Sequence, residues 1–427
     1  MTQAELANRT VRKVSWRILP LLGLGYLVAY IDRVNVSFAA LQMNVDLGFS
    51  ATVYGLGAGL FFLSYALFEV PSNVLMGRFG PRVWISRIMI SWGVVAIAMM
   101  FIRTPTHFYI MRFLLGMAEA GFTPAVIFYL SSWFPMRFRG LAGILMGAIA
   151  GPVLSLDGLH GLHGWQWLFL VTGLPAVMVG LIILFFLPDT PATARWLSED
   201  ESDWLQREMS TEAETIGEPA SHNILAALAN PVVLRLGIIG LLTIGSSVTL
   251  GLSVPLLLND ETGLDTTYVG LLTSLGSLLS VVGTLACGML CDRLGDRYGV
   301  LLASTAGVGL VYLVLALGLG HSSVVVVGAY LVWMFVYVIL TASSIVIWPD
   351  LLHPRQLAVG GAAINTMCQI GGFIGPYMWG VAKDATGSFT PGLYGLVVAN
   401  ALAWLIVFFL ARRARCGSGA AGFRADT

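Results

Sequence analysis

Charged residues are scarce in this chain of 427 residues. Lys, Arg, Asp and Glu make up only 11% of it, and hydrophobic residues make up 57%, whereas soluble domains contain roughly 25% charged residues. The four cysteines show no metal-ligand pattern, and no Gly-rich phosphate loop ending in Lys-Ser or Lys-Thr is present. These shortages argue against a soluble enzyme and against ATP-driven transport. We expect no cofactor, no metal and no nucleic-acid partner.

Long hydrophobic runs are abundant instead. A membrane-spanning helix needs about 20 mostly apolar residues, and only helices or closed barrels satisfy their backbone groups within lipid. The runs are too long and too continuously apolar for barrel strands, so we predict an all-α integral membrane protein with twelve transmembrane helices. They are residues 17–38, 52–75, 83–101, 107–130, 140–156, 166–187, 231–256, 268–290, 299–319, 323–347, 357–381 and 391–411.

Basic residues are distributed asymmetrically about these runs. All but four of the 23 Lys and Arg residues lie in the termini or in the loops on the side of the termini. The exceptions are Arg33, Arg103, Arg112 and Lys383. The positive-inside rule therefore predicts a multi-pass protein of the cell membrane with both termini in the cytoplasm. The first run contains Asp32 and Arg33 and no cleavage site follows it, so we do not expect a removable signal peptide.

The chain divides into two halves around its longest polar stretch. We expect residues 1–187 to form one six-helix bundle, residues 188–230 a solvated cytoplasmic linker, and residues 231–427 a second bundle with a tail. The halves share a repeat, because the loop after the second run aligns with the loop after the eighth, and the same offset carries Trp133 onto Trp348. Duplicated halves predict a substrate site near the membrane midplane between them.

Five charged residues lie well inside the runs, at least five residues from either end, and all are in the first third of the chain: Asp32, Arg33, Glu69, Arg112 and Glu119. A charge there costs about 2.5–3.5 kcal/mol, so it is retained where it is paired or faces a wet cavity. Arg112 and Glu119 are seven residues apart and share one helix face, separated by about 10 Å. With Asp32 and Arg33 their charges sum to zero. Two interpretations stay open: ion pairs that fix the first helix against the fourth, or a site in which protonation of an acid frees an Arg for a substrate carboxylate.

Several segments resemble known membrane transporters. Residues 288–297 (GMLCDRLGDR) resemble the loop signature of the major facilitator superfamily, and residues 73–82 are a degenerate copy. Five further segments resemble the anion:cation symporter family: residues 30–36 (YIDRVNV), 68–73 (FEVPSN), 112–122 (RFLLGMAEAGF), 164–169 (GWQWLF) and 187–191 (LPDTP). Within that family the tartrate and phthalate type is the most similar, and the galactonate transporters are more distant. This resemblance implies two pseudo-symmetric six-helix bundles and proton-coupled uptake of a small organic anion by alternating access.

The resemblance also implies roles for individual residues in the first half. Asp32 and Glu119 would carry the proton. Arg33 and Arg112 would bind or gate the anion, and Tyr65 would be a hydrogen-bond partner.

The second half has no charge well inside a run. Most of its Ser and Thr hydroxyls are expected to bond their own helix or a neighbour. Asn365, which the resemblance places in the binding cavity, shares a helix face with Gln369, and both amides can bond hydroxyls or a second carboxylate. We therefore expect proton coupling in the first half and recognition by neutral groups in the second.

A further set of charged residues is expected to gate the two halves at the cytoplasmic side. Glu69 lies low in the second run, where we favour a structural or inner-gate role over substrate contact. The set is Glu69, Arg78, Arg82, Asp292, Arg293 and Arg297.

The fifth run departs from the family pattern, because only about 16 residues separate Gly140 from Asp157. The tartrate-type transporters have a longer fifth helix, which puts the cavity shape in doubt. The leading hypothesis is a monomeric proton symporter for a hydroxy acid, a sugar acid or an aromatic carboxylate. The alternatives are an organic-anion exchanger or exporter and a sensor that binds without transport.

Overall fold

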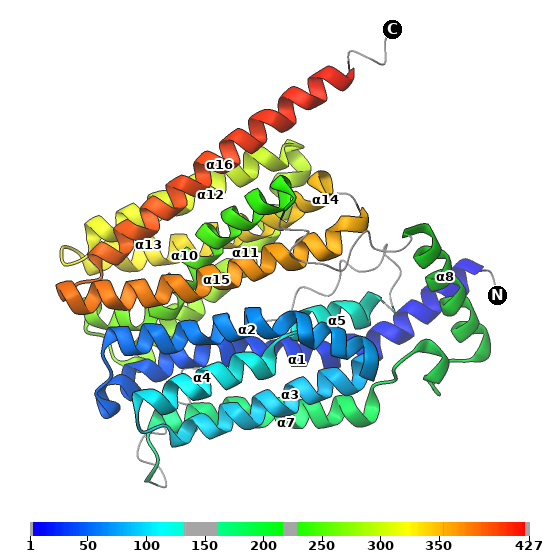
Figure 1. Ribbon diagram of the computed structural model, residues 1–427, viewed down its shortest axis with the longest axis horizontal. Coiled ribbons are helices and arrows are strands. Elements are labelled where there is room, and N and C mark those ends of the chain that lie inside the picture. Colours follow the sequence, from blue (N-terminus) through cyan, green and yellow to red (C-terminus); the bar gives the residue numbers. More distant parts are fainter. Residues whose placement is uncertain (1–2, 132, 134–160, 217–228, 353, 423–427) are drawn as a thin grey trace. The chain divides into compact units, whose positions relative to one another are not determined.

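The computed structural model describes residues 3–131, 133, 161–216, 229–352 and 354–422 (Figure 1). Every regular element in these ranges is a helix. The chain forms two compact units. The first comprises Met1–Leu47 and Leu60–Glu218, and the second comprises Gly48–Gly59 and Pro219–Thr427. The first turns of the second helix therefore belong to the second unit, whereas its remainder belongs to the first.

Nine helices in the described ranges are long and apolar enough to cross a membrane. They are α1 (Gln3–Leu47), α2 (Ala51–Phe79), α3 (Pro81–Ala98), α7 (Gly164–Phe186), α10 (Pro231–Thr262), α11 (Thr266–Leu294), α12 (Arg297–Gly318), α13 (Ser323–Val346) and α16 (Thr390–Gly422). The fourth predicted run coincides with α4 (Pro105–Glu119) and α5 (Phe122–Ser131), and the eleventh with α15 (Pro354–Thr386). The fifth run, residues 140–156, lies outside the described residues, and with it the expectation of a short fifth helix.

The fourth run is broken rather than continuous. Gly121 has a φ of 88°, a left-handed conformation that glycine adopts without steric cost, so α4 ends at Glu119 and α5 begins at Phe122. The Ser72 hydroxyl on α2 donates to the carbonyl oxygen of Ala120 at 2.6 Å, and the Trp84 indole donates to the Ser72 oxygen at 3.0 Å. Two neighbouring helices therefore hold the break, and it leaves Glu119 as the last residue of α4.

Small residues let helices approach closely in both units, as is usual where helices pack in lipid. α3 and α7 lie side by side (Figure 1), and a Cβ at Gly93 would lie 2.8 Å from the carbonyl oxygen of Gly173. A Cβ at Gly116 of α4 would collide with the carbonyl of Phe61 on α2. In the second unit a Cβ at Gly245 of α10 would lie 2.8 Å from the Gly371 backbone of α15.

Hydroxyl groups in the second unit mostly bond their own helix, which confirms the expectation from the sequence. Thr243, Ser247 and Thr249 on α10 each donate to the carbonyl four residues earlier, at 2.7 to 2.8 Å. Asn400 of α16 is an exception, because its amide donates to the carbonyl of Thr305 on α12 at 2.6 Å.

The N-terminal part of α1 extends well beyond the first hydrophobic run and carries a docked segment of the linker, α8 (Glu199–Ile216). Lys13 Nζ donates to Glu201 Oε2 at 2.7 Å, and Arg9 Nε lies 3.2 Å from the other oxygen. Glu201 and Leu205 are both buried. The other described residues of α8 are exposed or half-buried, so this part of the linker is a surface helix that is docked through Glu201 and Leu205.

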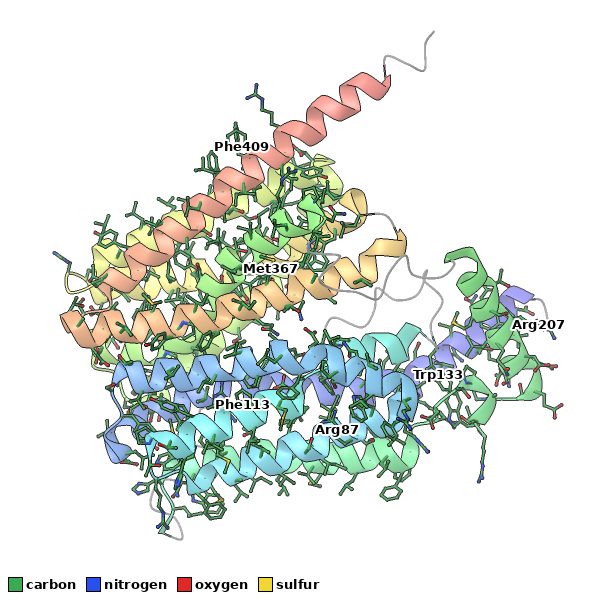
Figure 2. All side chains as sticks on the ribbon, viewed as in Figure 1. Arg87, Phe113, Trp133, Arg207, Met367 and Phe409 are labelled. Atoms are coloured by element: carbon green, nitrogen blue, oxygen red, sulfur yellow. The ribbon has the colours of Figure 1, made fainter. Side chains whose placement is uncertain are left out.

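Aromatic stacking anchors the linker just before α8. The Trp196 ring stacks on Trp133, with centroids 5.8 Å apart, and the Arg17 guanidinium lies 4.9 Å from the Trp196 centroid. Figure 2 labels Trp133 at this junction and Arg207 on α8. Ion pairs and stacked rings together hold the linker against the first unit.

We expect the docking of α8 on α1 to depend on pH. Burial by itself raises the pKa of Glu201, but hydrogen bonds from Lys13 and the Ser198 amide and the charges of Lys13 and Arg9 hold this pKa below its ordinary value of 4.5. Because the pKa of Glu201 is lower when α8 is docked, the ionised carboxylate stabilises the docked state at any pH above the ordinary pKa. This stabilisation is lost as the pH falls through the lowered pKa. The protection factors for hydrogen exchange in α8, which correct for the pH dependence of intrinsic exchange, should therefore be high at pH 7 and fall below pH 4.5.

Two variants test this expectation. Glu201→Gln should give fast exchange in α8 already at pH 7. Glu199→Gln removes a carboxylate that is exposed on the same helix, and it should leave the pH profile unchanged. Slow exchange in Glu201→Gln at pH 7 would show that the ion pairs do not hold α8.

Candidate functional site

An ion pair between α1 and α4 forms the centre of the candidate site. Arg33 Nη2 lies 2.6 Å from Glu119 Oε1, and Arg33 Nε donates to the same oxygen at 2.7 Å. The Glu119 side chain is completely buried, whereas 35% of the Arg33 side chain is exposed. Glu119 Oε2 has no hydrogen-bond partner in the described part of the chain. The Arg33 side chain is therefore partly exposed, while one oxygen of the buried Glu119 carboxylate has no hydrogen bond within the described residues.

Asp32 is held by an amide rather than by an arginine. Its Oδ1 accepts from Asn35 Nδ2 at 2.9 Å, and the same amide nitrogen lies 2.9 Å from Thr172 Oγ1 on α7. Asp32 is 1% exposed, and within the described residues its Oδ2 has no hydrogen-bond partner. It interacts electrostatically with Glu119, Arg112 and Arg33. The site therefore contains a second buried acid with an unused oxygen.

Aromatic rings of α2 lie within cation–π distance of both arginines. The Arg112 guanidinium lies 4.8 Å from the Phe61 ring centroid, and that of Arg33 lies 6.0 Å from the same centroid and 5.3 Å from the Tyr65 centroid. Cations are attracted to aromatic faces over such distances. Arg112, Phe61 and Tyr65 are all buried. Of the two arginines predicted to bind the anion, Arg33 is thus the more exposed one. The Tyr65 ring lies within cation–π distance of its guanidinium.

The structure brings Asp32, Arg33, Arg112 and Glu119 together in the first unit with Tyr65. Glu69 lies one turn beyond Tyr65 on α2, is 2% exposed and interacts electrostatically with that tyrosine. It therefore belongs to the buried interior next to the charged cluster.

Sequence reasoning missed Asn35, Thr172 and Phe61. Asn35 was detectable, because it follows Asp32 by three residues and so shares its helix face. Phe61 was one apolar residue among many in its run, and Thr172 lies in a distant run. No local signal marks either of them.

The predicted gating residues other than Glu69 lie at or next to helix ends. Arg82 Nε lies 3.1 Å from Asp189 Oδ2, and the Arg82 amide donates to Asp189 Oδ1 at 3.3 Å, so Arg82 is bound to the end of α7 within the first unit. Arg78 is exposed, and its guanidinium lies 5.9 Å from the Phe79 ring centroid.

In the second unit, Arg293 in the last turn of α11 and Arg297 at the start of α12 are exposed. The side chain of Asp292 lies outside the described residues.

Asn365 and Gln369 lie on α15 in the second unit, both half-buried. Phe373 follows at the same four-residue spacing and therefore lies on the same face. A Cβ at Gly59, in the first turns of α2, would lie 2.7 Å from the Phe373 carbonyl oxygen. The two amides thus lie on one face of α15. The same face packs against the first turns of α2 at Phe373, one turn after Gln369.

A comparison with known protein families decides the class of protein. The sequence model of the Major Facilitator Superfamily matches residues 22–376. The chain belongs to this superfamily. Its helical architecture agrees with the twelve-helix fold of that superfamily, and it is a multi-pass membrane transporter.

Similar proteins of this superfamily carry different names. The "Putative tartrate transporter" of Agrobacterium vitis is 42% identical over 424 residues, which cover 94% of this chain and 92% of that protein. The "Quinolone resistance transporter" of Acinetobacter baumannii is 37% identical over 420 residues, 95% of this chain and 96% of that protein. A solved D-xylose-proton symporter has a TM-score of 0.71 at 14% identity, covering 92% of this chain and 97% of that one, and this likeness shows the fold alone.

A double-mutant cycle on Arg33 and Glu119 tests the energetics of this transporter's ion pair. Arg33→Gln leaves the Glu119 carboxylate buried without its cation. Breaking a buried pair in this way costs roughly 3–5 kcal/mol. Since Arg33 is 35% exposed, we expect a loss of unfolding free energy near the lower end, about 3 kcal/mol, measured by thermal denaturation in detergent.

The double variant Arg33→Gln/Glu119→Gln should be more stable than Arg33→Gln alone, because it leaves no charge unpaired. Arg207→Gln is the control, since Arg207 and Asp203 form an exposed pair at 3.8 Å that contributes less than about 0.5 kcal/mol. A double variant as unstable as the sum of both single changes would mean that the pair has no coupling energy.

Proposed function

We propose that this transporter takes up a small organic anion together with a proton. The observation that supports the proposal best is the Arg33–Glu119 pair, in which a fully buried acid with an unused oxygen lies behind a partly exposed guanidinium. Such a pair can exchange partners. A proton on Glu119 removes its charge, and Arg33 then binds the carboxylate of the substrate.

Charge balance explains why proton and anion would move together. Asp32, Arg33, Arg112 and Glu119 have a net charge of zero when all four are ionised. An anion that entered without a proton would leave one net negative charge in a region of low dielectric constant, where uncompensated charge is costly. A proton on Glu119 or Asp32 restores neutrality. Binding of the proton therefore favours binding of the anion, and binding of the anion favours binding of the proton.

The geometry of arginine suits a carboxylate substrate. A guanidinium offers parallel N–H donors that match the two carboxylate oxygens. In the structure Arg33 directs both Nε and Nη2 toward Glu119 Oε1, the donors that a substrate carboxylate would take over. Tyr65 and Phe61 would hold the guanidinium in place during this exchange, because cation–π attraction to their rings does not depend on the state of Glu119.

The second proton site in this proposal is Asp32. Its Oδ2, like Glu119 Oε2, is a buried carboxylate oxygen without a hydrogen-bond partner among the described residues. Asn35 connects it to Thr172, so its state is linked to the contact between α1 and α7. Arg112, enclosed and close to Phe61, would balance the charge of the acids and gate the anion.

Recognition of the remainder of the substrate would come from the second unit. Asn365 and Gln369 offer amide donors and acceptors without charge. The relative from Agrobacterium vitis is named for tartrate, a hydroxy acid with two carboxylates. This name supports a hydroxy acid as the leading substrate hypothesis, followed by a sugar acid or an aromatic carboxylate.

Alternating access would proceed by rocking of two six-helix halves, residues 1–187 and 231–427, joined by the linker 188–230. Basic residues at the helix ends would lock and release the halves on the cytoplasmic side, where both termini would lie. The gating set is Glu69, Arg78, Arg82, Asp292, Arg293 and Arg297. The transporter would function as a monomer.

Uptake into proteoliposomes with an imposed inward proton gradient tests the proposal. The labelled panel is tartrate, galactonate, phthalate and 4-hydroxyphenylacetate, each with and without a protonophore. We expect one acid to accumulate and the protonophore to abolish that accumulation. Accumulation that a protonophore does not change would contradict proton coupling.

Glu119→Gln should abolish accumulation driven by the proton gradient while substrate exchange across the membrane is retained. The amide cannot ionise, so Arg33 stays available for the anion but no proton is carried. Counterflow of unlabelled against labelled substrate measures the retained exchange. The control is Glu199→Gln, which also turns a Glu into Gln but on exposed α8, and it should accumulate substrate as the unaltered protein does. Normal accumulation by Glu119→Gln would show that the proton site lies elsewhere.

Export or exchange of organic anions is the second candidate function. It is favoured by the Acinetobacter baumannii relative, which is named for quinolone resistance. An exchanger would show counterflow without dependence on the proton gradient, whereas a non-transporting sensor would bind a panel acid without any flux.

A further inference from the structure

A groove lies on the second unit between α10 and α16, and none of its lining residues belongs to the candidate site. It has a volume of about 280 Å³ and is lined by Arg235, Ile238, Ile406, Phe409 and Leu410. Figure 2 labels Phe409 on α16. Four of the five lining side chains are apolar, and the fifth is an arginine. The groove is therefore amphipathic.

Arg235 lies close to the beginning of α10. It follows Pro231 by four residues, which corresponds to about 6 Å along the helix. No described acid lies within ion-pair distance of it, and it is only half-buried. An unneutralised arginine in an apolar span is costly unless it reaches an anion or the polar headgroup layer. The charge of Arg235 is thus available to an anion in the headgroup layer.

The surroundings of the groove face lipid. Phe409 is 58% exposed, and Leu402, Leu405 and Leu234 are also large exposed apolar side chains on α16 and α10. A membrane-spanning chain exposes such residues to hydrocarbon. Arg412 follows Phe409 by three residues and is exposed at the end of the apolar span of α16. The groove is thus apolar along its walls, with basic residues toward one end.

We propose that this groove binds an anionic phospholipid. One acyl chain lies along Ile238, Ile406 and Phe409, and the phosphate contacts Arg235, with Arg412 adding positive charge nearby. Basic pockets between transmembrane helices bind anionic headgroups in this way. A free phosphate would not use the apolar wall, and an apolar peptide would leave Arg235 without a counter-ion. A zwitterionic lipid offers a phosphate as well, but its own ammonium group offsets that charge, so Arg235 favours a lipid with net negative charge. Because α10 begins and α16 ends at this end, the lipid belongs to the leaflet on the side of the termini.

Native mass spectrometry of the full chain in detergent tests the proposal. The probes are phosphatidylglycerol and phosphatidylcholine with identical acyl chains. We expect one phosphatidylglycerol to be retained at a concentration about fivefold lower than phosphatidylcholine, the size expected for one arginine near the headgroup. Arg235→Gln should abolish this preference, and Arg235→Lys should retain most of it. Ile406→Trp, which fills the groove but leaves Arg235 in place, should weaken retention of both lipids.

The controls separate the groove from general charge effects. Arg207→Gln removes one exposed positive charge from α8 and should leave the preference for phosphatidylglycerol unchanged. Glycerol 3-phosphate should not displace the lipid, and displacement at equal concentration would assign the site to a free phosphate instead. The thermal stability of each variant is first measured in lipid-free detergent. If Arg235→Gln misfolds, Arg235→Met, which also removes the charge, takes its place. Equal lipid preference in Arg235→Gln and the unaltered protein would overturn the proposal, and none of these measurements requires transport.

Discussion

The buried carboxylate of Glu119 is the constraint on which the candidate site depends. It lies at the end of α4, because Gly121 and the Ser72 hydrogen bond to Ala120 break the helix there. The C-terminal end of a helix carries partial negative charge and disfavours an anion, so a carboxylate at this position needs a cation. Arg33 supplies that cation from α1. A local break in one helix thus determines which side chain of a second helix must face it.

The remaining residues of the cluster follow from this pair and from close helix packing. Gly116 allows α2 to approach α4 so closely that a Cβ would collide with the Phe61 carbonyl. This approach places the Phe61 ring near the guanidinium groups of both Arg33 and Arg112. One aromatic face attracts two cations that would otherwise repel each other, and two buried acids balance their charge. Glycine packing and electrostatics therefore support the same arrangement.

Much of this architecture could be predicted from the sequence, because a long apolar run specifies a spanning helix without reference to its neighbours. The cluster of Asp32, Arg33, Arg112 and Glu119 was also predictable, since isolated charges in lipid must find one another. The break at Gly121 was not, because Gly116 in the same run lies in an intact helix and only the contact with Ser72 distinguishes the two positions. Docking of α8 was missed for a similar reason, since Glu201 meets Lys13 across 188 residues of sequence.

The two units differ in the kind of polar side chains that they contain. All of the ionisable residues that the sequence places well inside its hydrophobic runs belong to the first unit, whereas the second presents amides and hydroxyls, most of which are bonded to their own helices. A change of Asn365 or Gln369 alters the hydrogen bonds offered to a substrate without altering the net charge around Glu119. We infer that substrate preference can change through α15 while coupling through α1 and α4 is preserved.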